Sequence, residues 1–265
     1  MVTPDNGFRK MTVAGSKNNY MSGSTRDTIF NVDSVQEDFE FNQRVVEVFD
    51  DMVDRSIPHY RQVIESSAEL LSRLTREGDV VYDLGCSTGT SLLECARILG
   101  DKQLQFVGID NSAPMLEKAT LKAELHGKND VVSFKLEDIT KFSHHGAGAI
   151  ILNYTLQFIR PMQREDFIKK LFDTLRPGGI LLVSEKVLSH NPRLNREYID
   201  IYHSFKKSRG YSELEIAKKR EALENVLIPF SISENRAMLK KCGFDSVETY
   251  FQWFNFASFI ALKPA

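Results

Sequence analysis

Val80-Val81-Tyr82-Asp83-Leu84-Gly85-Cys86-Ser87-Thr88-Gly89-Thr90 is the stretch that decides the fold. An apolar run ends in an acid, a turn with two glycines follows, and apolar residues then recur at helical spacing. The pattern predicts a strand that breaks into a nucleoside-binding loop ahead of a helix. Because Gly85 and Gly89 have no Cβ, the backbone can turn sharply there and a ligand can lie against bare peptide groups.

A second apolar segment, Gln105 to Asp110, ends in a carboxylate at the place where doubly wound α/β proteins hold ribose hydroxyls. The loop lacks the G-x-G-x-x-G of dinucleotide sites. Its D-x-G-x-x-x-G pattern resembles instead the S-adenosylmethionine (SAM) loop of class I methyltransferase folds. A glycine turn that serves backbone geometry alone is the alternative. The paired acids, Asp83 and Asp110, favour a ligand site.

The composition indicates an ordinary globular protein. Of 265 residues 42% are hydrophobic, and 34 basic against 36 acidic residues leave a net charge of -2, which gives no overall attraction to nucleic acid. The longest apolar runs, such as 147–152 and 180–183, are far shorter than a membrane span. The polar segment 1–24 reads as a disordered leader or an extended start rather than as a secretory leader. We therefore expect a cytoplasmic protein.

Cysteines and histidines predict neither disulfides nor metal. Cys86, Cys95 and Cys242 are odd in number and lack zinc spacing, which fits a reducing compartment. Cys86 precedes a helix N-terminus that would favour a thiolate nucleophile, although a small side chain facing a ligand is the simpler interpretation. None of the six histidines forms an i, i+4 metal pair, and His144-His145 is expected to be solvated.

Residues 25–265 predict one SAM-binding α/β domain of Rossmann-like class I methyltransferase fold, with a mostly parallel sheet, an antiparallel C-terminal strand and helical caps. Apolar spacing predicts an N-terminal helical cap over about 38–75, and the charged segment from about 187 to 232 predicts an inserted helical cap. Arg176-Pro177-Gly178-Gly179 predicts a turn between a helix and a strand. The expected strands are 80–84, 105–110, 131–136, 147–153, 179–185, 246–253 and 256–262.

The carboxyl ends of parallel strands open into one crevice, so polar residues that follow different strands should meet there. Asp110 is suited to accept both hydroxyls of a ribose, with an N-cap for the next helix as the alternative. Asp138-Ile139 resembles a pair that contacts an adenine edge, with a surface turn as the alternative. Asn153 offers an amide but no base. The residues expected to converge are Asp83, Gly85, Asp110, Asn111, Asp138 and Asn153.

The cationic run Lys218-Lys219-Arg220 has two interpretations. Such a run is usually a solvated helix face. A crevice lined by three carboxylates would, however, need an imported guanidinium to hold an anionic substrate or product, because Arg grips a carboxylate with two parallel bonds. The residues alone leave both interpretations open.

From Arg26 to Lys263 the chain closely resembles the carboxy-S-adenosyl-L-methionine (carboxy-SAM) synthase family. Thr88 and Thr90 depart from a loop that is more apolar in that family, and 1–24 extends beyond its usual start. The strings that carry the resemblance are Arg26-Asp-Thr-Ile-Phe30, Val45-Val-Glu-Val-Phe49, Arg55-Ser-Ile-Pro-His-Tyr60, Tyr82-Asp-Leu-Gly-Cys-Ser87, Ile109-Asp-Asn-Ser112, Leu152-Asn-Tyr-Thr-Leu-Gln-Phe158, Ser184-Glu-Lys186, Gly210-Tyr-Ser-Glu-Leu-Glu-Ile216, Lys219-Arg220, Leu223-Glu-Asn-Val226 and Trp253-Phe-Asn-Phe256.

The resemblance implies conversion of SAM and prephenate into carboxy-SAM and phenylpyruvate. It further implies a homodimer that binds neither nucleic acid nor membrane directly, and a partner enzyme that uses carboxy-SAM to carboxymethylate a hydroxylated wobble uridine in tRNA. Arg220 is the implied catalytic residue, as the partner of the new carboxylate. The implied SAM-contacting positions are Tyr60, Gly85, Cys86, Ser87, Asp110, Asn111, Asp138, Ile139, Asn153 and Arg220.

Two other functions compete with this one: a conventional SAM-dependent methyltransferase of a small molecule, and a non-catalytic SAM-binding module. The absence of a base at Asn153 and the presence of Arg220 favour the carboxy-SAM synthase. The identity of the nucleoside that co-purifies would separate the three, since only the synthase has a use for a carboxylated sulfonium.

Overall fold

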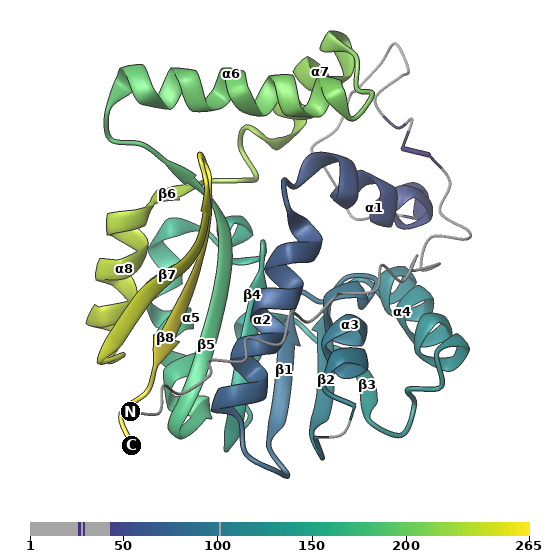
Figure 1. Cartoon of the computed structure of the whole chain (residues 1–265), viewed down its shortest axis with the longest axis vertical. Helices are drawn as coiled ribbons and strands as arrows, with labels where there is room; N and C mark the ends of the chain where they lie inside the picture. The colour runs from purple at the N-terminus through teal and green to yellow at the C-terminus, as the bar shows by residue number, and fades with distance from the viewer. Residues whose placement is uncertain (1–25, 28, 30–42, 101) are drawn as a thin grey trace, which may run out of the picture.

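The computed structural model describes residues 26, 27, 29, 43–100 and 102–265, and the predicted leader 1–24 lies outside them. Its centre is a sheet in the order β3-β2-β1-β4-β5-β8-β7, with the short β6 beside β5 (Figure 1). The strands are β1 (Val80–Leu84), β2 (Gln105–Asp110), β3 (Val132–Leu136), β4 (Ala147–Asn153), β5 (Leu175–Leu188), β6 (Phe230–Ser231), β7 (Ser246–Trp253) and β8 (Phe256–Leu262).

The pairing directions confirm the predicted fold class. The first five strands pair in parallel, and β8 pairs antiparallel with both β5 and β7. Central strands are apolar throughout: every residue of β4 before Asn153 is buried. Strands buried on both faces read as continuous apolar runs, because helices cover each side of a parallel sheet. The antiparallel pair β7 and β8 therefore closes one edge of this sheet, as the sequence predicted.

The strand β5 begins earlier than the sequence predicted. Arg176-Pro177-Gly178-Gly179 belongs to the strand, which starts directly after the helix that ends at Thr174. The register against β4 jumps from Ala147–Leu175 to Ala149–Ile180, so these four residues bulge out of the ladder. A bulge accommodates Pro177, which has no amide hydrogen to donate, and Gly178, whose φ is +69°.

Helices cover both faces of the sheet. On one face α2 and α3 pack on β1, β2 and β4 through residues such as Leu71 and Leu92, and on the other α5 and α8 pack through Ile168 and Leu239, all fully buried. Each such side chain contributes about 1.5–3 kcal/mol of burial free energy. These helices are α2 (Tyr60–Leu74), α3 (Thr90–Ile98), α4 (Ala113–Leu125), α5 (Pro161–Thr174) and α8 (Ile232–Lys241).

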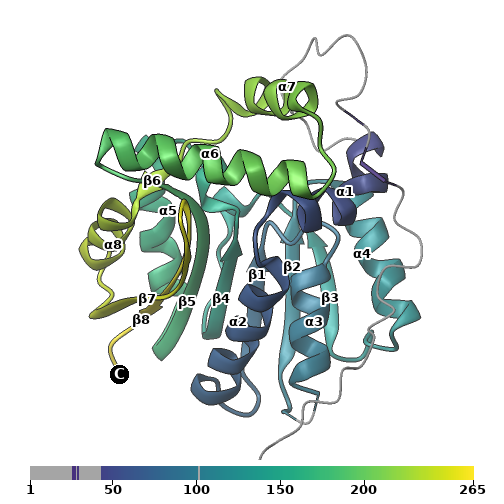
Figure 2. The ribbon, with the colours of Figure 1, turned by 45° about the horizontal axis from the view of Figure 1, so that its top comes forward.

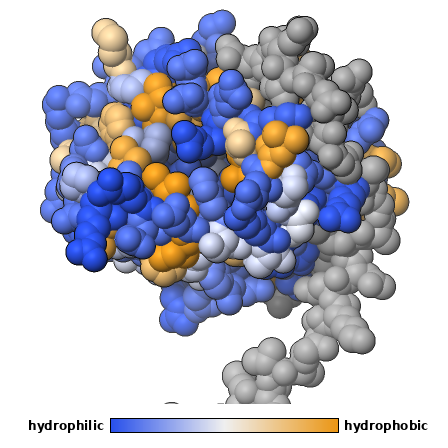
Figure 3. All heavy atoms as spheres, turned by 90° about the horizontal axis from the view of Figure 1, so that it is seen from above, coloured by the Kyte–Doolittle hydropathy of each residue, from blue (hydrophilic) through white to orange (hydrophobic). Residues whose placement is uncertain are grey.

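Three further helices lie over the carboxyl ends of the parallel strands: α1 (Gln43–Ser56), α6 (Pro192–Ser208) and α7 (Glu213–Leu223) (Figures 1 and 2). Asn191 caps α6, and Ser212 with Glu215 forms a capping box at the start of α7, so the ends of both helices are fixed locally. Seen from above, the face that carries α6 and α7 is largely hydrophilic with hydrophobic side chains near its centre (Figure 3). None of the helices in the described part of the chain is long and apolar enough to cross a membrane.

Candidate functional site

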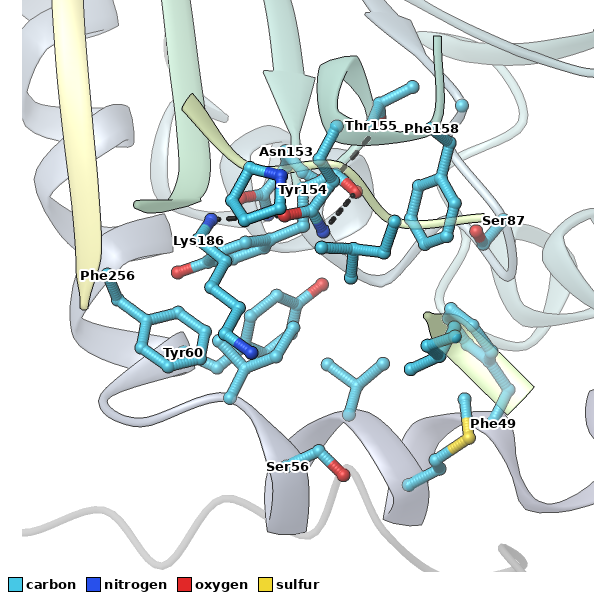
Figure 4. A pocket seen from close by; sticks show the side chains of 18 of the residues that line it. Phe49, Ser56, Tyr60, Ser87, Asn153, Tyr154, Thr155, Phe158, Lys186 and Phe256 are labelled. Carbon is cyan, nitrogen blue, oxygen red and sulfur yellow. Dashed lines mark hydrogen bonds between the residues drawn. The ribbon is translucent and has the colours of Figure 1, made fainter. Parts of the chain in front are cut away.

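A cavity of about 670 Å³ lies between the carboxyl ends of the strands and the helices above them (Figure 4). Every residue that the sequence singled out for ligand contact lines it, although these residues come from six separate segments. The set comprises Tyr60, Gly85, Cys86, Ser87, Asp110, Asn111, Asp138, Ile139, Asn153 and Arg220. The topology thus brings together what the sequence keeps far apart.

The glycine loop after β1 forms the floor of one half of the cavity. Gly85 and Gly89 have φ of +78° and +72°, where other residues are strained. An added Cβ on Gly85 would lie 2.6 Å from the Thr155 side chain, and one on Gly89 would lie 2.8 Å from Phe134. Both glycines are therefore required by backbone conformation and by packing. Ser87 also has positive φ, at 49°, within the loop that faces the cavity.

Asp110 links this loop to the next strand. One carboxylate oxygen accepts the Ser87 amide at 2.9 Å, and the other accepts the Ser112 amide at 2.9 Å. The second bond serves the start of α4, where the Ser112 side chain makes no capping bond. Burial raises the pKa of Asp110, and the backbone bonds oppose that shift. A carboxylate has about four lone-pair sites, so this one retains acceptors for a ribose diol. The capping and ribose roles are compatible.

Two buried acceptors that line the cavity have no hydrogen-bond partner among the described residues: one oxygen of Asp83 and the amide oxygen of Asn153. The Asn153 amide nitrogen donates to Ser91 at 2.8 Å, and Ser91 also contacts the Tyr60 hydroxyl at 2.9 Å, which fixes the orientation of the amide. Burial and nearby Asp110 raise the pKa of Asp83 to about 7. Unpaired buried acceptors of this kind fit the ammonium group of SAM.

Asp138 is partly engaged by its own turn. One of its carboxylate oxygens accepts the Thr140 amide at 2.9 Å and the Thr140 hydroxyl at 2.7 Å, which caps the short helix η2 (Ile139–Lys141). The Thr140 bond lowers the pKa of Asp138. The surface-turn interpretation is therefore correct for this side chain, while Asp138 and Ile139 still line the cavity and remain available to an adenine ring.

The nucleophile hypothesis for Cys86 is wrong. Burial, together with nearby Asp83 and Asp110, raises the pKa of its thiol well above the ordinary value, so the thiolate is disfavoured. Its sulfur would lie 2.8 Å from a Cβ on Gly108, and the residue acts as a small packing group. Cys95 and Cys242 are buried free thiols. No cluster of metal-ligating side chains occurs among the residues that the structure describes.

The half of the cavity below α6 and α7 is cationic. Arg220 and its neighbour Lys219 both line the cavity from α7, but Arg220 is exposed whereas Lys219 is only 7% exposed. A purely solvated helix face is therefore the wrong description of the run 218–220. Within the described ranges, Arg220 makes no hydrogen bond or ion pair. Other cationic or titratable residues on this side are Lys186, His203, Lys206 and Glu224.

A polar cluster that sequence analysis missed joins α1 to the glycine loop. Asp50 accepts the hydroxyls of Thr88 at 2.6 Å and Thr90 at 2.9 Å, and its carboxylate pairs with Lys122 at 2.8 Å. Burial alone would raise the pKa of Asp50, but Lys122 and the hydrogen bonds lower it. Thr88 and Thr90 thus tie a helix above the cavity to its floor. In the sequence, the acid at Asp50 and the two threonine hydroxyls are the only signal of this cluster.

His144 is also less solvated than the sequence predicted. Its ring lies 5.3 Å from Tyr82 and 4.8 Å from Phe142, and its side chain is 28% exposed, with Glu137 at 3.7 Å. The neighbouring His145 is exposed, as predicted. These contacts lie outside the cavity lining and do not contribute to the site.

Comparisons with known proteins define the class. A model described as a methyltransferase domain matches residues 81–179. An O-methyltransferase family protein from Burkholderia thailandensis superposes with a TM-score of 0.61 at 19% identity, over 85% of this chain and 61% of that one. Human N-acetylserotonin methyltransferase in complex with SAM gives 0.57 at 16% identity, over 84% and 56%. The fold is that of class I SAM-dependent methyltransferases.

Closer relatives define the family. A carboxy-S-adenosyl-L-methionine synthase from Desulfotalea psychrophila is 65% identical over 239 residues, which is 90% of this chain and 98% of that protein. The synthase from Wolinella succinogenes is 50% identical over the same shares. The chain therefore belongs to the carboxy-SAM synthase family and is an enzyme of the transferase class. This confirms the family resemblance drawn from the sequence.

Proposed function

We propose that the enzyme converts SAM and prephenate into carboxy-SAM and phenylpyruvate. The observation that carries the proposal is the division of the cavity into two oppositely charged halves. Asp83, Asp110 and Asp138 line the half at the strand ends, and Lys186, Lys206 and Arg220 are among the cations of the other half. The acidic half suits a nucleoside with a cationic sulfonium and ammonium, and the cationic half suits a carboxylate-bearing substrate.

The acidic half fits SAM group by group. Asp110 would accept the ribose hydroxyls, and the unpaired oxygens of Asp83 and Asn153 would accept the ammonium. Asp83, whose pKa is raised to about 7 by burial and by Asp110, would become fully ionised beside that cation. The loop from Gly85 to Ser87 offers bare backbone, and Asp138-Ile139 lines the cavity where the adenine would lie.

No protein base is required for the proposed chemistry. Prephenate aromatises by losing carbon dioxide and hydroxide, and the hydroxide removes a proton from the sulfonium methyl to give water and an ylide. The ylide carbon then bonds to the carbon dioxide carbon, and a carboxylate forms on the former methyl. Arg220 is placed to pair with that carboxylate. The protein's task is to hold both reactants together and to exclude water, which would otherwise quench the ylide.

The carboxylates and the Tyr60 hydroxyl of the cavity lining offer no evident base. Apart from the three aspartates assigned to SAM, Glu224 is the other carboxylate among its described lining residues, and Glu224 is exposed. The Tyr60 hydroxyl is buried and bonded to Ser91, and burial raises its pKa, which disfavours a phenolate base. A conventional methyltransferase acting on an amine or hydroxyl would gain nothing from the cationic half.

The proposal is tested by incubating the purified enzyme with SAM and with prephenate labelled in its ring carboxylate. We expect labelled carboxy-SAM and unlabelled phenylpyruvate, identified by mass spectrometry. Incorporation of label from bicarbonate, with none from prephenate, would overturn the proposed chemistry. A methylated product from a third substrate, without carboxy-SAM, would instead indicate a conventional methyltransferase.

By the same resemblance we infer three further properties. The product serves a separate tRNA carboxymethyltransferase as the donor for wobble uridine modification, the enzyme acts in the cytoplasm, and it is a homodimer. What supports the first is the chemistry of carboxy-SAM, which carries an activated carboxymethyl group. Sedimentation equilibrium in the analytical ultracentrifuge tests the homodimer, and a mass equal to that of the monomer would contradict it.

A further inference from the structure

We propose that Lys186 and Lys206 form a second anion subsite, which holds a carboxylate of the co-substrate apart from the carboxylate partnered by Arg220. The inference rests on the proposed function and names the side chains that would bind the co-substrate. Its occupant is a flat ring that carries a carboxylate on a side arm. Prephenate and phenylpyruvate both have this chemistry.

The first argument is that the two ammonium groups have no anionic partner. Lys206 is only 5% exposed, yet within the part of the chain that the structure describes neither Lys186 nor Lys206 makes an ion pair or a side-chain hydrogen bond. Figure 4 shows Lys186 extending from β5 into the cavity. A buried charge without a partner is costly, so a site that retains two of them is built to receive an anion.

The second argument is that the neighbouring charges have the same sign. Burial lowers the pKa of Lys206, and so do Lys186, Lys219 and Arg220. Burial and Arg220 lower the pKa of Lys186. Each cation therefore raises the cost of charging the others, and an anion among them relieves both the repulsion and the desolvation.

The third argument is that these ammonium groups adjoin a cluster of aromatic rings. The Nζ atoms of Lys206 and Lys186 lie 4.6 and 5.2 Å from the centre of the Tyr202 ring. Tyr202 packs edge-on against Phe256 at 5.0 Å, and Phe256 contacts Tyr154. Rings of this kind pack against a flat cyclic group, while the ammonium groups would take its carboxylate.

The position of the subsite fits a ligand that reacts at its other end. Lys186 lies near the end of β5 and Lys206 near the end of α6, whereas Arg220 lies on α7. Binding the side-arm carboxylate at the lysines would leave the ring carboxylate free to depart as carbon dioxide. Lys186 and Lys206 would thus position the co-substrate, and neither would touch the reacting atoms.

The test uses Lys186→Met and Lys206→Met, which keep a long apolar stem and remove the charge. Phenylpyruvate is titrated by calorimetry into protein saturated with SAM, and SAM is titrated separately. We expect each substitution to weaken phenylpyruvate binding about tenfold to hundredfold while SAM affinity stays within about threefold. In turnover, the KM for prephenate should rise by a similar factor with kcat largely retained.

Lys207→Met is the matched control, because Lys207 is the next residue of the same helix and its side chain is 49% exposed, paired with Glu213. It should change neither affinity. Lys206→Arg should recover part of the phenylpyruvate affinity, which a purely structural role of Lys206 would not predict. Thermal unfolding of each variant identifies any that fail to fold. If Lys206→Met does not fold, Lys186→Met tests the subsite independently, because Lys186 lies on a different element.

Two outcomes would overturn the inference. Unchanged phenylpyruvate affinity in both folded variants would show that the lysines do not hold the co-substrate. An equal loss of SAM affinity would show that they hold the carboxylate of SAM instead. Failure of the proposed function is a separate result, since it appears as wild-type enzyme that forms no carboxy-SAM from prephenate.

Discussion

Lys219 Nζ lies 3.5 Å from Asp27 Oδ2, and both side chains are buried at the place where the N-terminal part of the described chain meets α7. The Tyr211 hydroxyl donates to the same Asp27 oxygen, and the Lys219 ammonium also donates to Ser56 at 2.9 Å. Because Arg220 is the next residue, the cluster fixes the helix from which Arg220 faces the cavity. The buried pair of Asp27 and Lys219 thus helps to hold Arg220 in place at the cavity.

Removing Asp27 should destabilise the protein strongly. Asp27→Ala leaves Lys219 buried without its carboxylate, and breaking a buried pair in this way costs about 3–5 kcal/mol. Lys219→Met should cost less, since Asp27 retains its hydrogen bond from Tyr211. The double variant Asp27→Ala, Lys219→Met should be more stable than Asp27→Ala alone, because it leaves neither member of the pair charged and unpaired. Urea denaturation measures these free energies. A double variant that is less stable than Asp27→Ala would contradict the argument.

Asp110 should carry much of the affinity for SAM. Its charge-assisted bonds to two ribose hydroxyls are worth about 1.5–3 kcal/mol each, so Asp110→Ala should weaken SAM binding by more than about tenfold. The loss includes the support that Asp110 gives to the Ser87 amide. Asp138→Ala is the comparison, because Asp138 is partly engaged by Thr140 and should matter less. Unchanged SAM affinity of Asp110→Ala by calorimetry would rule out the ribose role.

The pH dependence of anion binding should follow Lys206. Burial and nearby cations lower its pKa to about 7 in the free protein, and a bound carboxylate favours the charged form and raises that pKa. Binding therefore takes up a proton, and affinity falls as the pH rises above about 7. We expect calorimetry of phenylpyruvate to show weaker binding at about pH 8 than at about pH 6.5.

The pKa of Lys186, the other member of the subsite, is also lowered by burial and by Arg220, so Lys186→Met is measured beside Lys206→Met. Two further titrating groups on this side can be separated from Lys206. The pKa of His203 is lowered by burial and nearby cations, which favours the neutral ring. Burial lowers the pKa of Lys219 to about 8, which places its proton loss above that of Lys206. Lys206→Met should therefore weaken the pH dependence of phenylpyruvate affinity below about pH 8. A slope that persists unchanged in this variant would assign it to another group.

The sheet and the acidic half of the site were predictable because their signals are local. Apolar runs that end in Asp83, Asp110 and Asn153 predict strands, and the carboxyl ends of parallel strands lie at the same edge of the sheet. In the cationic half, Arg220 was a candidate from the sequence, but Lys186 and Lys206 were not predictable from pattern, since they meet only after β5 and α6 pack. For Cys86 the sequence already favoured a small side chain over a nucleophile, but the burial that raises the pKa of its thiol is visible only in the structure.

Arg220 should distinguish the product from SAM. The product has a carboxylate where SAM has a methyl, and a guanidinium that lines the cavity without another partner among the described residues is free to pair with it. A charge-assisted contact is worth about 1.5–3 kcal/mol, so Arg220→Ala should weaken carboxy-SAM binding about tenfold to hundredfold and leave SAM affinity nearly unchanged.

Substitution by lysine sharpens the argument about Arg220. Arg220→Lys should recover only part of the carboxy-SAM affinity, because an ammonium lacks the planar fork that binds both carboxylate oxygens. Arg209→Ala serves as the control, since Arg209 is exposed and does not line the cavity. Its Cζ atom lies 5.3 Å from the centre of the Phe205 ring. Calorimetry with both nucleosides on each variant decides the matter. Equal losses for SAM and carboxy-SAM would indicate that Arg220 supports the fold of α7 rather than the new carboxylate, and no loss for either would place it on a solvated helix face.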